Sequence, residues 1–164
     1  MEYLIEKFTS LLTFFAALGS GLIAGTFFAF SAFVMNALAR LPSHQGIAAM
    51  QSINIVVLNR LFLTVFTGTA LVSLILLIIS LFHWKDTSFV FILSGSLLYL
   101  LGSFLVTGVC NVPLNDSLAN LDVKDAASAS LWKEFIVNWK AWNHVRTIAS
   151  LMAMVSFILA LWRR

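Results

Sequence analysis

The chain has 164 residues, of which 60% are hydrophobic and 10% are charged. A soluble globular domain cannot bury this much apolar surface, so the composition excludes that class and indicates an integral membrane protein. The formal net charge is +3, but the basic residues flank apolar stretches, which is typical of membrane topology signals and not of nucleic-acid binding.

Four long apolar stretches without charged residues run along the chain, and each can cross a hydrocarbon core of about 30 Å. Unpaired backbone groups are very costly in lipid, so uninterrupted apolar stretches of this kind must form helices. The predicted spans cover residues 8–35, 61–82, 89–110 and 146–162. The sequence therefore predicts an all-α fold, a single domain over residues 1–164 that forms a four-helix transmembrane bundle, with further helices in the two long connections on one side.

Both termini are expected on the same side of the membrane, together with the short connection 83–88. Glu2 and Glu6 stand where a signal peptide would carry basic residues, so we expect the first span to remain attached. Basic residues are densest in the short segments on the side of the termini, whereas the opposite side carries more of them in total. On the density of positive charge we predict cytoplasmic termini.

The first span carries small residues at intervals of four, which let another helix approach closely in lipid. They are Ala17, Gly21, Gly25 and Ala29. This face indicates either packing within the bundle, which we favour, or a homo-oligomer formed through Gly21 and Gly25. Gly95 and Gly102 repeat the pattern in the third span, so we expect the first and third spans to touch.

The first long connection, residues 36–60, begins with a turn at Leu41, Pro42 and Ser43, and Ser43 could cap a following helix. Apolar residues then recur at helical spacing, at Ile47, Met50 and Val57. This pattern predicts an amphipathic helix at the membrane interface.

Polar residues of the second and third spans are expected at the same membrane level. The third span carries Ser96, Ser103, Thr107 and Asn111 at intervals of seven, four and four. Asn111 and Asn115 flank Pro113 at an expected helix end, where they could bond freed backbone groups or reach into a cavity. Asn59 and Arg60 begin the second span and would add another amide and another guanidinium.

Residues 132–146 carry an aromatic and hydrogen-bonding face on what we predict to be one long helix that continues into the fourth span. Steps of three and four align Trp132, Trp139, Asn143 and Arg146, with Trp142 beside them. Arg146 would lie at the membrane boundary, where it either extends to lipid phosphate or faces the bundle interior. The three tryptophans favour an enclosed pocket over a simple interfacial belt.

The histidines and the single cysteine, Cys110, do not predict a metal site. His44 and His144 have no Cys, Asp or Glu at ligand spacing, so we expect neither metal nor haem. His144 could serve as a neutral proton acceptor beside Asn143 and Arg146, or face the lipid headgroups.

Two motifs give the chain a family resemblance. Asn111-Val-Pro-Leu-Asn115, followed by Trp132 and by Trp139-Lys-Ala-Trp-Asn-His-Val-Arg146, resembles the signature of the anthrone oxygenase-like membrane family. The similarity extends to the small residues of the first span and to the Asn-Arg start of the second. It implies oxidation of an anthrone to an anthraquinone by molecular oxygen, without a dedicated cofactor.

The resemblance suggests a role for each predicted site residue. His144 would be the base, and Arg146 with Asn143 and Asn111 would hold the enolate oxygen. The aromatic substrate would stack on Trp132, Trp139 and Trp142, with Asn115, Asn59 and Arg60 lining the same site. The expected partners are membrane lipid and a hydrophobic aromatic small molecule. The alternative is a non-catalytic bundle that binds a lipid or quinone, or that stabilises a partner membrane protein.

Overall fold

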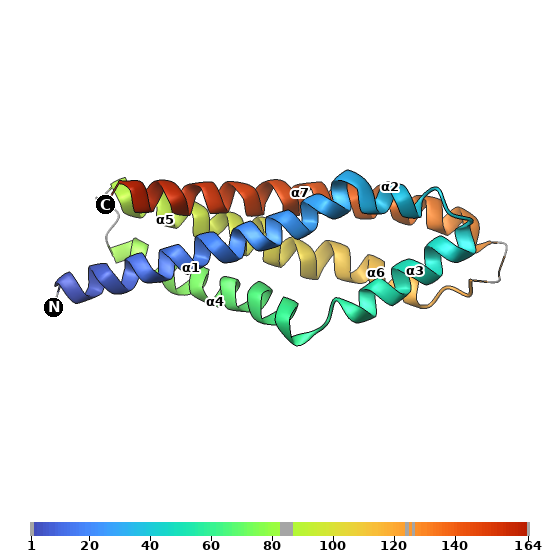
Figure 1. The fold of residues 1–164 in the computed structure, drawn as a ribbon, viewed down its shortest axis with the longest axis horizontal. Coiled ribbons are helices and arrows are strands. Elements are labelled where there is room, and N and C mark those ends of the chain that lie inside the picture. The colour runs from blue at the N-terminus through green and yellow to red at the C-terminus, as the bar shows by residue number, and fades with distance from the viewer. Residues whose placement is uncertain (1, 83–86, 124, 126, 164) are drawn as a thin grey trace.

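A computed structural model describes residues 2–82, 87–123, 125 and 127–163, and it is an elongated bundle of helices (Figure 1). Four helical segments are long and apolar enough to cross a membrane: Tyr3–Leu38, Arg60–Phe82, Ser88–Ala119 and Ser128–Trp162. The predicted all-α fold with four spans is confirmed. Most of the connection 83–88 lies outside the described residues.

Two of the four spans are built from several consecutive helical segments. The first comprises α1 (Glu2–Ala29), the π-helix η1 (Phe30–Val34) and α2 (Met35–Leu38). The third comprises α5 (Thr87–Leu97), the π-helices η2 (Leu98–Leu105) and η3 (Thr107–Asn111), and α6 (Val112–Ala119). The second and fourth spans are α4 (Arg60–Phe82) and α7 (Ser128–Trp162), and α3 (Ser43–Val56) lies in the first long connection.

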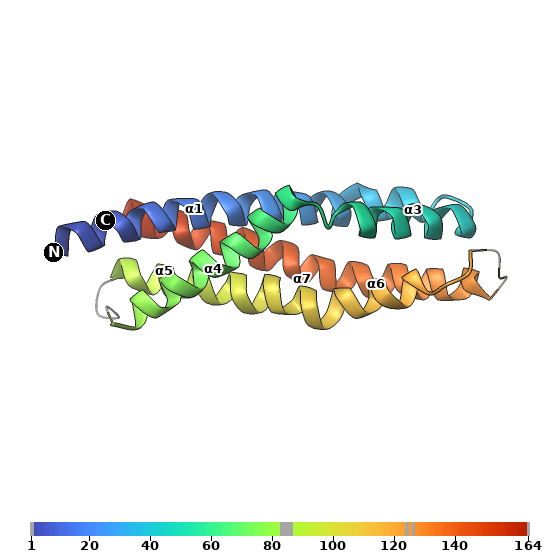
Figure 2. The same ribbon diagram turned by 90° about the horizontal axis from the view of Figure 1, so that it is seen from below.

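The spans form a ring in which α1 packs against α4 and α7, and α5 packs against the same two helices. The start of α1 and the end of α7 lie at one end of the molecule, as predicted for termini on the same side (Figures 1 and 2). The largest fully buried side chains of the ring are Tyr99, Phe157, Ile23, Leu76 and Ile92. This packing fixes the relative positions of the polar residues on α1, η3 and α7.

The helices extend beyond the membrane at the end opposite the termini. With 35 residues, α7 is about 52 Å long, whereas a hydrocarbon core is about 30 Å thick. The additional length, together with α2, α3 and α6, forms what we call the cap. A second apolar cluster holds the cap together: Met35, Leu38, Ile47, Met50, Leu118, Trp132, Phe135 and Trp139.

The amphipathic helix predicted in the first connection is present as α3, and its apolar face packs onto the protein. Ile47 and Met50 are fully buried in the cap cluster. Gln51 Nε2 donates hydrogen bonds to the carbonyls of Leu118 and Leu121, at 2.9 and 3.2 Å, which fastens α3 to the end of α6. Ser43 is the first residue of the helix and makes no capping bond, because Pro42 occupies the N-cap position.

The small residues of the third span face α7 and not α1, so the predicted contact between the first and third spans is wrong. A Cβ atom at Gly95 would lie 2.9 Å from the Phe157 ring, and one at Gly102 would lie 2.5 Å from the Ala149 Cβ. In the first span, a Cβ at Gly21 would meet the Met154 sulfur, whereas one at Gly25 would meet nothing within 4 Å.

Pro113 does not end the third helix as predicted, because a π-helix precedes it. Proline removes one backbone donor and crowds the carbonyl four residues earlier, which breaks a regular α-helix. Here η3 ends at Asn111, and Pro113 falls in the first turn of α6, where fewer backbone donors need a partner within the helix. Asn111 and Asn115 therefore lie on one continuous helical path.

Candidate functional site

Arg146 is the centre of a buried polar cluster at the boundary between the transmembrane ring and the cap. Its side chain is 4% exposed. Nη2 donates to Asn143 Oδ1 at 2.7 Å, and Nη1 donates to Thr107 Oγ1 at 3.2 Å. The guanidinium therefore points into the bundle and not toward lipid headgroups.

Two aromatic rings flank the guanidinium. Its central carbon lies 4.1 Å from the centroid of the Phe27 ring and 5.2 Å from that of Trp139. Phe30 packs against Trp139 from the first span, with 5.6 Å between the ring centroids. Cation–π contacts of this kind stabilise the positive charge of the guanidinium and hold it against the two rings.

Asn143 connects the fourth span to the first. Its Nδ2 donates to the carbonyl of Phe27 and to Ser31 Oγ, both at 2.8 Å. Thr147 donates to the carbonyl of Asn143 at 2.7 Å and lies 3.3 Å from the Ser31 hydroxyl. Asn143 is fully buried, so these bonds fix the amide oxygen that accepts from Arg146.

The two asparagines around Pro113 bind Trp139 from opposite ends. Asn111 Nδ2 donates to the Trp139 carbonyl at 3.3 Å, and Trp139 Nε1 donates to Asn115 Oδ1 at 2.8 Å. Asn111 is 1% exposed. Both asparagines therefore bond to α7, and not to backbone groups freed at a helix end.

The cluster carries a positive charge and unused hydrogen-bonding capacity. Among the described residues no carboxylate pairs with Arg146, and its Nε is buried without a hydrogen-bond partner. Asn111 Oδ1 is also buried and unpartnered. Cys110 lies three residues after Thr107 in η3 and is half-buried. A buried cation with a free donor can bind an anionic oxygen, and the adjacent rings can bind a flat apolar molecule.

The structure places three predicted residues of α7 away from the guanidinium. His144 is exposed, and Trp142 is 42% exposed. Each lies one residue from Asn143, about 100° around the helix, so neither can share its inward direction. Trp132 is buried, but it lies 14 residues before Arg146, about 21 Å along α7, and belongs to the cap cluster. The predicted convergence of His144, Trp142 and Trp132 on Arg146 is therefore wrong.

Asn59 and Arg60 also lie outside the cluster, and both are exposed. Asn59 Oδ1 accepts from the backbone N–H of Phe62 at 3.0 Å, and Asn59 Nδ2 donates to the carbonyl of Val56 at 3.0 Å. This is the geometry of a helix N-cap, so Asn59 starts α4 and does not line the site.

Sequence reasoning missed the contributions of Phe27 and Ser31 from the first span. Nothing in the pattern of an apolar span reveals which of its residues will face another span. In α3, Asn54 Nδ2 is also buried without a hydrogen-bond partner. In the part of the chain that the structure describes, no three His, Cys, Asp or Glu residues gather as metal ligands.

Comparison with known proteins adds one match. The family model described as Anthrone oxygenase matches residues 56–156, which is more than half of the chain. The matched segment includes Asn111, Trp139, Asn143 and Arg146, whereas Phe27 and Ser31 precede it. Searches of curated proteins and of solved structures gave no match.

Proposed function

The chain belongs to the anthrone oxygenase family, and on this premise we propose that it is a membrane-embedded oxygenase acting on a polycyclic aromatic ketone of the anthrone type. Molecular oxygen is the oxidant, and no dedicated cofactor takes part. The observation that carries the proposal is the buried guanidinium of Arg146, which has only neutral partners among the described residues and an Nε–H without a hydrogen-bond partner.

The proposed reaction uses the acidity of the carbon opposite the ring ketone. Loss of one proton from this carbon gives an enolate, whose negative charge lies largely on the ketone oxygen. The electron-rich carbon reduces oxygen and forms a C–O bond, giving a peroxide. Loss of the second C–H proton and cleavage of the O–O bond then give the second ketone, so anthrone and O2 yield anthraquinone and water.

Arg146 supplies the main stabilisation of the enolate in this proposal. A donor placed at a developing oxyanion in a site that excludes water contributes roughly 10²–10³ in rate. Asn143 and Thr107 hold the guanidinium in position, and the rings of Phe27 and Trp139 contact the face of the polycycle. The free Nε–H is available for the ketone oxygen.

The proton acceptor in this proposal is Cys110 of η3. It lies three residues after Thr107, which bonds Arg146, so it can take the carbon proton while the guanidinium receives the enolate oxygen. The base assigned from the sequence, His144, is exposed on α7, so it is the alternative acceptor only if a substrate extends to the outer surface.

A second candidate function is quinone or lipid binding without catalysis. For a non-catalytic bundle we would expect the Arg and Trp residues to face lipid headgroups. Trp142 is exposed, but Arg146 and Trp139 are buried. An enclosed guanidinium fits a ketone or quinone oxygen, so the two functions differ in whether oxygen is consumed.

Purified protein in lipid vesicles, mixed with anthrone, tests the proposal through an oxygen electrode and the absorbance of anthraquinone. We expect one O2 consumed per anthrone, at a rate proportional to protein and well above that of empty vesicles. Cys110→Ser should lower the rate at least about tenfold, whereas His144→Gln should leave it within about twofold. A rate equal to that of empty vesicles rejects the oxygenase. A near-normal rate in Cys110→Ser together with a strongly lowered rate in His144→Gln rejects Cys110 as the base.

A further inference from the structure

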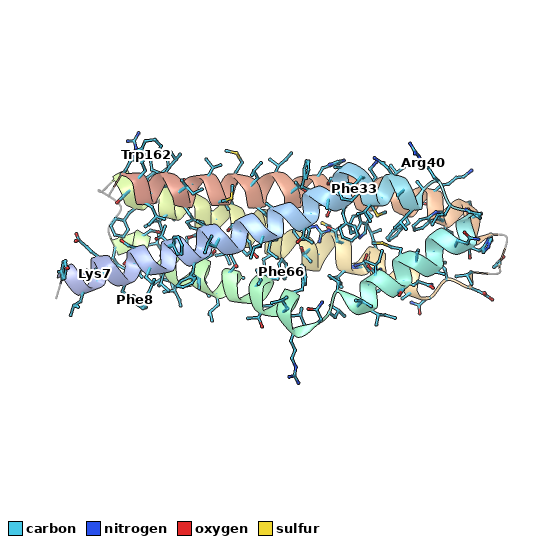
Figure 3. All side chains as sticks on the ribbon, viewed as in Figure 1. Lys7, Phe8, Phe33, Arg40, Phe66 and Trp162 are labelled. Carbon is cyan, nitrogen blue, oxygen red and sulfur yellow. The ribbon has the colours of Figure 1, made fainter. Side chains whose placement is uncertain are left out.

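Phe66 of α4 is the centre of an aromatic cluster on the membrane side of Arg146. Figure 3 shows it between Lys7 and Arg40 along the length of the molecule. Its ring contacts four others, which come from α1, α4 and η2. The centroid distances are 6.4 Å to Phe27, 5.7 Å to Phe62, 6.4 Å to Tyr99 and 5.2 Å to Phe104.

The cluster connects the lipid-facing surface to the guanidinium. At its inner end, the Phe27 ring lies beneath Arg146, at 4.1 Å. At its outer end, Phe104 is 39% exposed, whereas Phe66 is 7% and Phe27 is 5% exposed. Phe104, Phe66 and Phe27 thus form a continuous path of ring contacts between the surface of the bundle and the site.

The opposite approach to Arg146, through the cap, is filled with packed side chains. Trp139 and Phe135 belong to the cap cluster directly above the site, and Trp132 stacks on Phe135 with 5.5 Å between centroids. Gln51 further fastens α3 to the carbonyls at the end of α6. An apolar molecule dissolved in the bilayer meets the aromatic cluster without crossing this cap.

The third span is π-helical beside the cluster. Phe104 lies in η2, and η3 begins three residues later. π-Helical segments break the regular backbone bonding pattern and occur frequently at functional sites. Gly108 follows Phe104 by about one turn, and a Cβ atom at Gly108 would meet nothing within 4 Å. A side chain at position 108 would therefore meet no neighbouring atom at its Cβ, one turn from Phe104.

We propose that the aromatic substrate reaches Arg146 laterally from the bilayer, between α4 and the π-helical part of the third span. It passes Phe104, Phe66 and Phe27 in turn, and the closely packed ring of Phe66 selects for planar molecules because a flat ring system needs the least displacement of its neighbours. The substrate class rests on the proposed function. The path itself rests on the ring contacts and on the exposure of Phe104.

Two variants change this path in opposite ways. Gly108→Leu adds a side chain next to Phe104 in open space, and we expect it to lower kcat/KM for anthrone about tenfold with kcat within about twofold. Phe66→Ala removes the central ring, and we expect it to raise kcat/KM for an anthrone with a bulky non-planar substituent about tenfold relative to unsubstituted anthrone. Gly68→Leu is the matched control. Its Cβ position is also open, and it lies about 200° around α4 from Phe66.

A second measurement separates the path from the chemistry. The rate at which anthraquinone quenches tryptophan fluorescence reports binding without turnover, and Gly108→Leu should slow this association about tenfold while Gly68→Leu should not. If the wild-type protein binds anthraquinone but consumes no oxygen, the oxygenase proposal is overturned. The path is still supported in that case if Gly108→Leu binds anthraquinone more slowly than the wild type and Gly68→Leu does not. The path alone is overturned if the wild type turns over anthrone while both variants behave like it. In that case Gly108→Leu has unchanged kcat/KM and association rate, and Phe66→Ala has an unchanged ratio of kcat/KM between the bulky and the unsubstituted anthrone.

Discussion

Arg146 gains its chemical character from the neutrality of its partners. A buried arginine in a folded protein usually pairs with a carboxylate, and such a pair would leave little charge for a ligand. Asn143 and Thr107 instead orient the guanidinium through an amide oxygen and a hydroxyl. The positive charge is held in place but not neutralised, which suits an enolate that forms only during the reaction.

Two substitutions of Asn143 distinguish its contribution to stability from its effect on the charge of Arg146. Asn143→Leu removes its bonds to Phe27, Ser31 and Arg146, and we expect the free energy of unfolding to fall by about 1–3 kcal/mol. Asn143→Asp also loses the bond donated to the Phe27 carbonyl, but it places a carboxylate beside Arg146, so we expect a similar loss of stability and oxygen uptake at least about tenfold lower than that of Asn143→Leu.

Thermal unfolding in detergent and oxygen uptake with anthrone measure the two effects. Wild-type oxygen uptake by Asn143→Asp would mean that the reaction does not use a free charge on Arg146.

The residues of the site were only partly predictable from the sequence. Arg146, Asn143 and Trp139 could be placed together because steps of three and four along one helix fix a common face. The same rule directs His144 away from Arg146, since two residues correspond to about 200° around a helix. The contacts from Phe27 and Ser31 depend on how the first span docks on the fourth, and the spacing within either span does not contain that information.

The π-helical segments bring the polar residues of different spans together at the level of Arg146. Ser31 lies in η1, and Thr107 and Asn111 lie in η3. Hydropathy predicted these spans as uninterrupted helices, and it could not show a local change in helical pitch. The same limit explains Pro113, whose place inside a continuous helix follows from η3 and not from its own sequence context.

Close packing between spans makes one glycine sensitive and another tolerant to the same substitution. Alanine normally stabilises a helix by about 1 kcal/mol relative to glycine. At Gly102 the new methyl group would lie 2.5 Å from the Ala149 Cβ, so we expect Gly102→Ala to destabilise the protein by about 1–3 kcal/mol. At Gly25 the space is open, so Gly25→Ala should leave stability equal or higher.

Thermal unfolding of the two variants in one detergent checks this difference. A destabilised Gly25→Ala would indicate that the Gly25 face packs against another copy of the chain, which remains the prediction for a homo-oligomer. An unaffected Gly102→Ala would contradict the close approach of the third span to α7.

At the scale of the molecule, the four spans were predictable because their apolar length is imposed by the membrane. The cap was predictable only as helices in the long connections. Its packing follows from the length of α7, which runs from the cap through the ring and carries both Trp132 and Arg146. The order of the spans around the ring could not be predicted from the sequence, because it depends on which glycines and aromatic rings of different spans contact one another.

The predicted orientation has a direct test in intact cells. In a Cys110→Ser background, a membrane-impermeant maleimide should label Arg40→Cys and leave Lys7→Cys and Arg163→Cys unlabelled, because the last two lie at the end of the termini and we predict that end to be cytoplasmic. The reverse pattern would overturn the cytoplasmic assignment. Different labelling of Lys7→Cys and Arg163→Cys would contradict an even number of spans.

The buried charge of Arg146 is the centre of the account, and oxygen uptake by Arg146→Gln tests it most directly. Arg40→Gln, the same change at an exposed arginine of the cap, is the control. We predict that Arg146→Gln lowers kcat/KM for anthrone about a hundredfold or more while the protein unfolds at an unchanged or higher temperature, and that Arg40→Gln stays within about twofold of wild type. Near-normal oxygen uptake by a folded Arg146→Gln protein would contradict the account.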